Sequence, residues 1–166
     1  LLNQMQNNPF TLLDTFKLYI DIANKELKAL VKRVDLFCIN FNEARAISGM
    51  DGRSLNKMAK SILDLGPKSL IIKDGENGSY YFDSKNYFSV KAFPVKKVID
   101  TTGAGDAYIG GLLMGKMNNK NVLESMMVGA VTASFCIEGV GIDGLLKMNT
   151  KSFNHRLLWM QKNHTS

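Results

Sequence analysis

The chain has 166 residues, of which 45% are hydrophobic and 22% are charged, and its formal net charge is +6. This length and composition suffice for the core of one domain, which excludes an intrinsically disordered protein. The positive charge favours an anionic ligand only weakly, because the basic residues are scattered and do not interleave with aromatic residues as in nucleic-acid-binding segments. We therefore expect no nucleic-acid partner.

Membrane and redox signals are weak along the whole sequence. No apolar run is long enough to span a membrane, and no signal peptide is visible. Cys38 and Cys136 lie in apolar segments, where small buried side chains are expected rather than a disulfide or a metal pair. These features predict a cytoplasmic protein without a membrane partner. Because the chain begins at Leu1 rather than at a methionine, we expect it to be a piece of a longer protein.

Short apolar strands alternate with helices along the chain. The expected strands are 9–14, 35–40 and 69–73, then a hairpin of 79–82 and 87–90, and a strand end at 98–100. The expected helices are 20–34, 42–48, 54–65, 105–116, 122–138 and 150–161. This alternation predicts an α/β fold with a mainly parallel sheet that is covered on both faces.

Polar residues follow three of these strands, in the segments 40–43, 73–78 and 100–106. In open parallel sheets, ligands bind beyond the carboxyl ends of the strands. We therefore expect the binding site to be built from these three segments.

The third segment reads Asp-Thr-Thr-Gly-Ala-Gly-Asp and joins a strand to a helix rich in small residues. Its glycines let successive N–H groups point one way, and the helix N-terminus adds a partial positive charge, so the turn suits a phosphate. Asp106 could orient a hydroxyl and accept its proton while the amides of Ala104, Gly105 and Asp106 hold the phosphoryl group under attack. The alternative is a glycine-rich turn that only caps the helix.

Two other phosphate-binding motifs nearly occur here. The dinucleotide fingerprint Gly-x-Gly-x-x-Gly fails because its third glycine is Tyr108. A P-loop nearly occurs at 110–117, but Met117 stands where a hydroxyl should hold magnesium, and the segment lies inside an expected helix. We discount both motifs.

The segment 100–107, followed by an aromatic residue and two glycines, resembles the signature of the ribokinase-like carbohydrate kinases, the PfkB family. Residues 40–43 (Asn-Phe-Asn-Glu) match the family's Asn-x-x-Glu motif, and 71–78 resemble the strand and Gly-x-x-Gly turn that contacts the nucleotide. Residues 134–141 look like the segment beside the adenine and the monovalent-cation loop.

The resemblance implies a ribokinase-like three-layer α/β sandwich with a Rossmann-like, mainly parallel sheet. Residues 1–166 would be its C-terminal part, without the acceptor-binding N-terminal half and the lid. The implied reaction is transfer of the γ-phosphoryl group of ATP to a hydroxyl of a sugar or nucleoside. Asp106 would be the catalytic base, with Gly103, Ala104 and Gly105 in the catalytic turn.

The resemblance also implies the cofactor-binding positions, which are Asn40, Glu43, Lys73, Gly75, Gly78 and Gly105. Asn40 and Glu43 would organise Mg²⁺ largely through water, whereas Lys73 could contact a phosphate or the ribose, or simply reach solvent. Asp100 and Thr102 fit the first part of a monovalent-cation (K⁺) site whose remaining ligands are not evident, so a potassium requirement stays open.

Several properties of the full-length protein also stay open. The sequence does not name the acceptor. A homodimer is compatible with the family, whose dimer contacts usually come from the lid. A non-catalytic nucleotide-binding module descended from such a kinase is the alternative function if the chain is complete.

Overall fold

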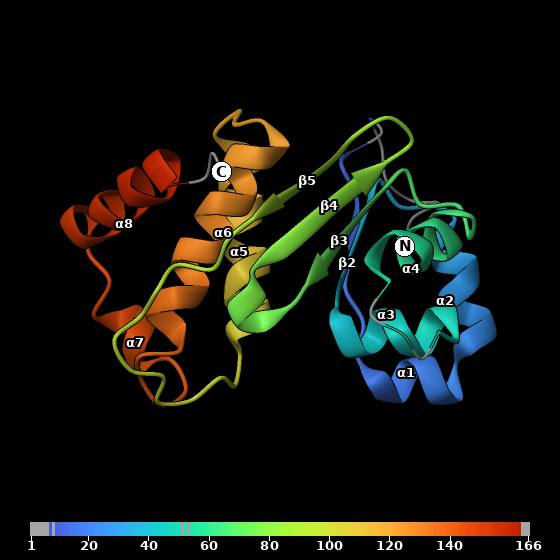
Figure 1. The fold of residues 1–166 in the computed structure, drawn as a ribbon, viewed down its shortest axis with the longest axis horizontal. Helices are drawn as coiled ribbons and strands as arrows, with labels where there is room; N and C mark the ends of the chain where they lie inside the picture. The colour runs from blue at the N-terminus through green and yellow to red at the C-terminus, as the bar shows by residue number, and fades with distance from the viewer. Residues whose placement is uncertain (1–6, 8, 51, 53, 164–166) are drawn as a thin grey trace. The chain divides into compact units, whose positions relative to one another are not determined.

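The computed structural model describes residues 7, 9–50, 52 and 54–163. Its strands form one sheet in the order β1-β2-β3-β4-β5 (Figure 1). The strands are β1 Leu12–Leu13, β2 Leu36–Asn40, β3 Ser69–Lys73, β4 Ser79–Asp83 and β5 Tyr87–Val90. The helices are α1 Lys17–Ile22, α2 Asn24–Val31, α3 Phe41–Ser48, α4 Leu55–Leu63, α5 Ala104–Met117, α6 Val122–Cys136, α7 Asp143–Leu146 and α8 Thr150–Asn163, with a 3-10 turn η2 at Gly75–Asn77.

The chain divides into two compact units. The first runs up to Lys73 and includes Tyr81–Tyr87, and the second consists of Asp74–Tyr80 and the residues from Phe88 onward. Within the described part of the chain, none of the helices has both the length and the apolar character needed to cross a membrane.

The first unit is organised by parallel strands. β1 pairs with β2, and β2 pairs with β3, both in parallel. β2 and β3 are each a short run of apolar residues buried in the core, as expected for strands covered on both faces. Cys38 and Cys136 are both free and buried, which confirms that they are small core residues.

Two expected elements differ from the structure, and one short helix was not expected. The helix expected at 20–34 is two helices, because the backbone leaves the helical region at Ala23 (φ −128°, ψ 35°). Apolar spacing marks the buried face of such a segment and is insensitive to a break of one residue. Residues 98–100 do not form a strand, since the amides of Ile99 and Asp100 both donate to the carbonyl of Ile137, at 2.8 and 3.4 Å. The four-residue helix α7 is too short to give a periodic signal.

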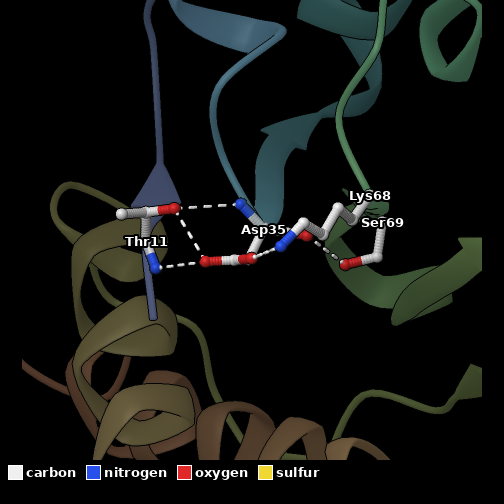
Figure 2. Close-up of polar contacts among 4 residues, drawn as sticks. All are labelled: Thr11, Asp35, Lys68 and Ser69. Carbon is white, nitrogen blue, oxygen red and sulfur yellow. Dashed lines mark hydrogen bonds and ion pairs between the residues drawn. The ribbon is translucent and has the colours of Figure 1, made fainter. Parts of the chain in front are cut away.

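The amino-terminal ends of β1, β2 and β3 are tied together by Asp35 (Figure 2). Its Oδ2 accepts hydrogen bonds from the amide and the hydroxyl of Thr11, both at 2.8 Å, and its Oδ1 accepts one from Nζ of Lys68 at 2.6 Å. The hydroxyl of Ser69 donates to the Asp35 carbonyl at 2.7 Å. A single residue just before β2 therefore connects the two strands on either side of β2.

The hydrogen bond from Lys68 is the main cause that lowers the pKa of Asp35, and the bonds from Thr11 add to it. A lowered pKa means that the carboxylate stabilises the fold above its unfolded-state pKa of about 3.9, and that this contribution is lost as the pH falls through the folded-state pKa. We expect Asp35→Asn to lower the free energy of unfolding at neutral pH by about 2 kcal/mol, the usual range for hydrogen bonds to a charged group. The difference from wild type should shrink in acid.

Urea unfolding of the full-length protein at a series of pH values measures this effect. Asp64→Asn is the control, because the Lys60–Asp64 pair is exposed at the C-terminal end of α4 and should contribute less than about 1 kcal/mol. A loss for Asp35→Asn no larger than that for Asp64→Asn would contradict this role of Asp35.

Candidate functional site

Two of the predicted site residues face each other across neighbouring strands. Asn40 is the last residue of β2 and Lys73 the last of β3, and the register sets them directly opposite. Both lie at the carboxyl end of parallel strands, where open α/β sheets place their ligands. The structure therefore brings together Asn40, Glu43 and Lys73 from the predicted set.

Asn40 and Glu43 form a capping box at the start of α3. The Glu43 amide donates to Oδ1 of Asn40 at 2.9 Å, and the Asn40 amide donates to Oε2 of Glu43 at 2.8 Å. This arrangement fixes both side chains at the helix N-terminus. The Asn-x-x-Glu spacing, which the sequence analysis relates to magnesium, therefore has a structural role, and the second carboxylate oxygen of Glu43 is not part of the capping box.

Glu43 is buried although it carries a carboxylate. Burial is the main cause that raises the pKa of its carboxyl, and the hydrogen bond from the Asn40 amide opposes the rise. Asp14 raises this pKa further and Lys73 lowers it, so both charges lie within Coulombic range of Glu43. The carboxyl end of the sheet is therefore a compact group of charged side chains.

Asp14 was missed by the sequence analysis, although it follows β1 directly. Its Oδ1 lies 3.5 Å from Nζ of Lys73, and the two side chains are only 31% and 14% exposed. The neighbouring Thr15 is buried, and its hydroxyl has no hydrogen-bond partner among the described residues. The strand-end rule that selected the other segments would have found Asp14 had it been applied to the strand expected at 9–14.

A divalent cation at this end of the sheet would have few direct protein ligands among the described residues. No group of three or more His, Cys, Asp or Glu side chains in the described ranges is placed to hold a metal ion. A Mg²⁺ ion beside Asn40 and Glu43 would therefore keep several water ligands, which is its usual preference.

In the second unit, the turn after β3 depends on two glycines. Gly75 and Gly78 have φ of +54° and +91°, and a Cβ on Gly78 would lie 2.1 Å from the carbonyl oxygen of Val90. The buried hydroxyls of Ser79 and Tyr108 are 2.8 Å apart in a hydrogen bond. Because Tyr108 belongs to α5, this bond connects the Gly-x-x-Gly turn to the helix that carries Asp106.

The turn before α5 has the backbone expected of an anion site. Gly103 is the N-cap and adopts the left-handed conformation with φ +78°. The Ala104 amide donates to the Thr101 carbonyl at 3.1 Å, so it is partly engaged. The amides of Gly105 and Asp106 have no hydrogen bond to other described residues, as is usual in the first turn of a helix. Asp106 is exposed in this first turn.

Asp100 connects this turn to the loop after α6. One carboxylate oxygen accepts from the Thr102 amide at 2.9 Å and the other from the Gly141 amide at 3.4 Å. The bond from the Thr102 amide is the main cause that lowers the pKa of Asp100. Cys136 Sγ lies 3.6 Å from the carbonyl oxygen of Thr102 and 3.9 Å from that of Gly141. The carbonyl oxygens of Thr102 and Gly141, one from each segment, therefore both lie close to the Cys136 sulfur.

The helices α5 and α6 pack closely through glycine. A Cβ on Gly111 would lie 2.4 Å from Oγ1 of Thr132, and one on Gly129 would lie 2.7 Å from the carbonyl oxygen of Tyr108. The glycines of the discounted P-loop segment 110–117 lie inside α5, which confirms that this segment is helical. Close packing against α6 holds α5, and with it Asp106, in a fixed position within the second unit.

Comparison with known proteins gives one family and one fold. The model of the pfkB family carbohydrate kinases matches residues 3–147. The 5-dehydro-2-deoxygluconokinase of Clostridium beijerinckii is 29% identical over 126 residues, which are 75% of this chain and 35% of that protein. The nucleoside kinase of Methanocaldococcus jannaschii, an archaeal member of the ribokinase family, superposes with a TM-score of 0.77 at 21% identity, over 95% of this chain and 51% of that one.

The ribokinase of Arabidopsis thaliana, solved with ribose and ATP, gives a TM-score of 0.70 at 25% identity, over 78% of this chain and 43% of that one. The fold is thus ribokinase-like, as the sequence predicted. The chain spans between 35% and 51% of the length of these three proteins.

Proposed function

Because this chain belongs to the pfkB family of carbohydrate kinases, we propose that it carries the nucleotide-binding and catalytic part of an ATP-dependent kinase. The reaction is transfer of the γ-phosphoryl group to a hydroxyl of a sugar or a nucleoside. The observation that carries the proposal is the left-handed turn at Gly103, which starts α5 with two unengaged amides and a carboxylate in its first turn.

In this proposal, the amides of Gly105 and Asp106 bind the phosphoryl oxygens, with Gly103 and Ala104 shaping the turn. The partial positive charge of the helix N-terminus favours an anion there. Asp106 accepts a hydrogen bond from the acceptor hydroxyl, orients its oxygen toward phosphorus and takes its proton during transfer. Positioning and charge neutralisation account for most of such a reaction.

The nucleotide is bound by Lys73 and by the turn that contains Gly75 and Gly78, whose exposed backbone can approach a ligand closely. Asn40 and Glu43 would hold Mg²⁺ through water molecules. When bound, Mg²⁺ neutralises charge on the phosphate oxygens. Asp100, Thr102 and the carbonyl of Gly141 are the candidate surroundings of a K⁺ ion that would stabilise the anion-binding turn.

The proposed reaction also requires a site that binds the acceptor, and no residue of this chain is assigned to that site. The matched relatives are two to three times as long as the part of them that this chain covers. We therefore propose that the acceptor-binding residues correspond to the part of those relatives that this chain does not match. Whether the acceptor is a sugar or a nucleoside would be determined by that part.

We expect Asp106→Asn in the full-length protein to lower kcat by roughly 10²–10⁴-fold, the usual loss when a general base is removed. The dissociation constant for Mg-ATP should stay the same or decrease slightly, because a negative charge near the phosphates is removed. The free energy of unfolding should change by less than about 1 kcal/mol, which is the contribution of an acid in the first turn of a helix. Steady-state kinetics with a matched acceptor measures the first effect, and calorimetry the second.

Asp64→Asn makes the same chemical change at the exposed C-cap of α4 and should leave kcat unchanged. If Asp106→Asn keeps more than about a tenth of wild-type turnover, Asp106 is not the base. If the wild-type protein binds Mg-ATP but transfers phosphate to none of a broad set of sugars and nucleosides, the non-catalytic module replaces the kinase as the better account.

We expect Glu43→Gln to raise the Mg²⁺ concentration needed for half-maximal activity. Glutamine also completes a capping box, so α3 should keep its N-terminal cap while the negative charge is lost. The matched control is Glu124→Gln, because Asn121 and Glu124 form a second capping box at the start of α6 with the same bonds. A magnesium titration of kinase activity that is unchanged in Glu43→Gln, or shifted equally in Glu124→Gln, would remove Glu43 from the metal site.

A further inference from the structure

The ion pair between Asp14 and Lys73 joins residues of two strands that are not neighbours in the sheet. Asp14 follows β1 and Lys73 ends β3, and β2 lies between these strands in the sheet. Since neighbouring strands are about 4.8 Å apart, the two side chains must reach toward each other across the end of β2. The two side chains meet beside the end of β2, where Asn40 is the last strand residue and α3 follows.

The geometry of the pair leaves the ammonium of Lys73 able to bind a further anion. Its distance to Oδ1 of Asp14 is 3.5 Å, longer than the 2.6 Å between Lys68 and Asp35. An ammonium has three N–H donors, and this contact uses one carboxylate oxygen. The Lys73 side chain is only 14% exposed, so its flexible stem is already held in place before any ligand binds.

Holding a lysine in place matters for binding. A free lysine side chain loses roughly 1.5–2 kcal/mol of rotamer entropy when it becomes ordered. A neighbouring carboxylate that orders it in advance removes part of that cost from the binding step. Asp14 also balances the charge of the ammonium while no anion is bound.

We propose that Asp14 is a positioning residue that holds the Lys73 ammonium at the carboxyl end of the sheet, opposite Asn40, for contact with a nucleotide phosphate. This inference rests on the proposed function, because it assumes that a nucleotide binds at this edge. Asp14 acts through Lys73 and not by touching the nucleotide. Removal of Asp14 should therefore matter only when Lys73 is present.

The test measures dissociation constants of the full-length protein for ATP and adenosine at saturating Mg²⁺, in wild type, Lys73→Met, Lys73→Arg, Asp14→Asn and the Asp14→Asn/Lys73→Met double variant. We expect Lys73→Met to weaken ATP binding by about tenfold to hundredfold, the range for loss of a charge-assisted hydrogen bond. Adenosine binding should change by less than about twofold, because adenosine lacks the phosphates, and Lys73→Arg should restore most of the ATP affinity.

The double variant isolates the role of Asp14. Replacing Asp14 removes a negative charge near the phosphates in both backgrounds, so this direct effect cancels in a double-mutant cycle. In each background, the effect of Asp14→Asn is the ATP dissociation constant with the substitution divided by the constant without it. We expect this ratio to be at least about threefold larger when Lys73 is present than when it is replaced by methionine. Equal ratios in the two backgrounds would overturn the inference, as would normal ATP affinity in Lys73→Met.

Lys68→Met is the matched control. It removes a lysine that pairs with an aspartate just before the start of β3, at the opposite end of the strand (Figure 2). It should destabilise the protein without changing the ATP affinity, and an equal loss of ATP affinity would show that Lys73 acts only through stability.

Should Lys73→Met not fold, Lys73→Gln replaces it in the cycle. A wild-type protein that binds neither ATP nor ADP would reject the proposed function itself, whereas normal wild-type binding with unaffected variants rejects this inference alone.

Discussion

The parallel register that sets Asn40 opposite Lys73 is the constraint on which the site in the first unit depends. A shift of one residue would send each side chain of β3 to the other face of the sheet. The network of Thr11, Asp35, Lys68 and Ser69 stabilises this register from the amino-terminal ends of the same strands. A hydrogen-bonded network at the amino-terminal ends of these strands therefore supports the register that places Asn40 opposite Lys73 at their carboxyl ends.

The second unit depends on close packing of backbone. Glycine at 111 and 129 lets α5 and α6 approach, and the hydroxyl pair of Ser79 and Tyr108 ties α5 to the Gly-x-x-Gly turn. Asp100 joins the turn before α5 to the loop after α6. The turn before α5 is thus held by three neighbouring segments, which gives it the rigid support that the proposed phosphoryl transfer would require.

Most strands and helices were predictable because apolar runs and caps are local signals. The Asn-x-x-Glu and Gly-rich motifs were also found, since each has a fixed spacing. The break at Ala23 was not predictable, because apolar spacing is insensitive to a one-residue change in the backbone. The binding of residues 99–100 to Ile137 was not predictable, because it is a contact between distant segments. Asp14 was missed for a different reason: it belongs to no motif of fixed spacing, and the strand-end rule was not extended to the first strand, so its ion pair with Lys73 is what draws attention to it in the structure. The roles assigned to Asp106, Glu43 and Lys73 stay predictions.

The central proposal is that the chain binds a purine nucleotide, with the turn at Gly103 as an anion site. Calorimetric titration of the full-length protein with Mg-ATP, Mg-ADP and NAD tests it most directly, because the same backbone features could be mistaken for a dinucleotide site. The account predicts that ATP or ADP binds with magnesium and that NAD binds more weakly or not at all. Tighter binding of NAD than of either adenine nucleotide would contradict it.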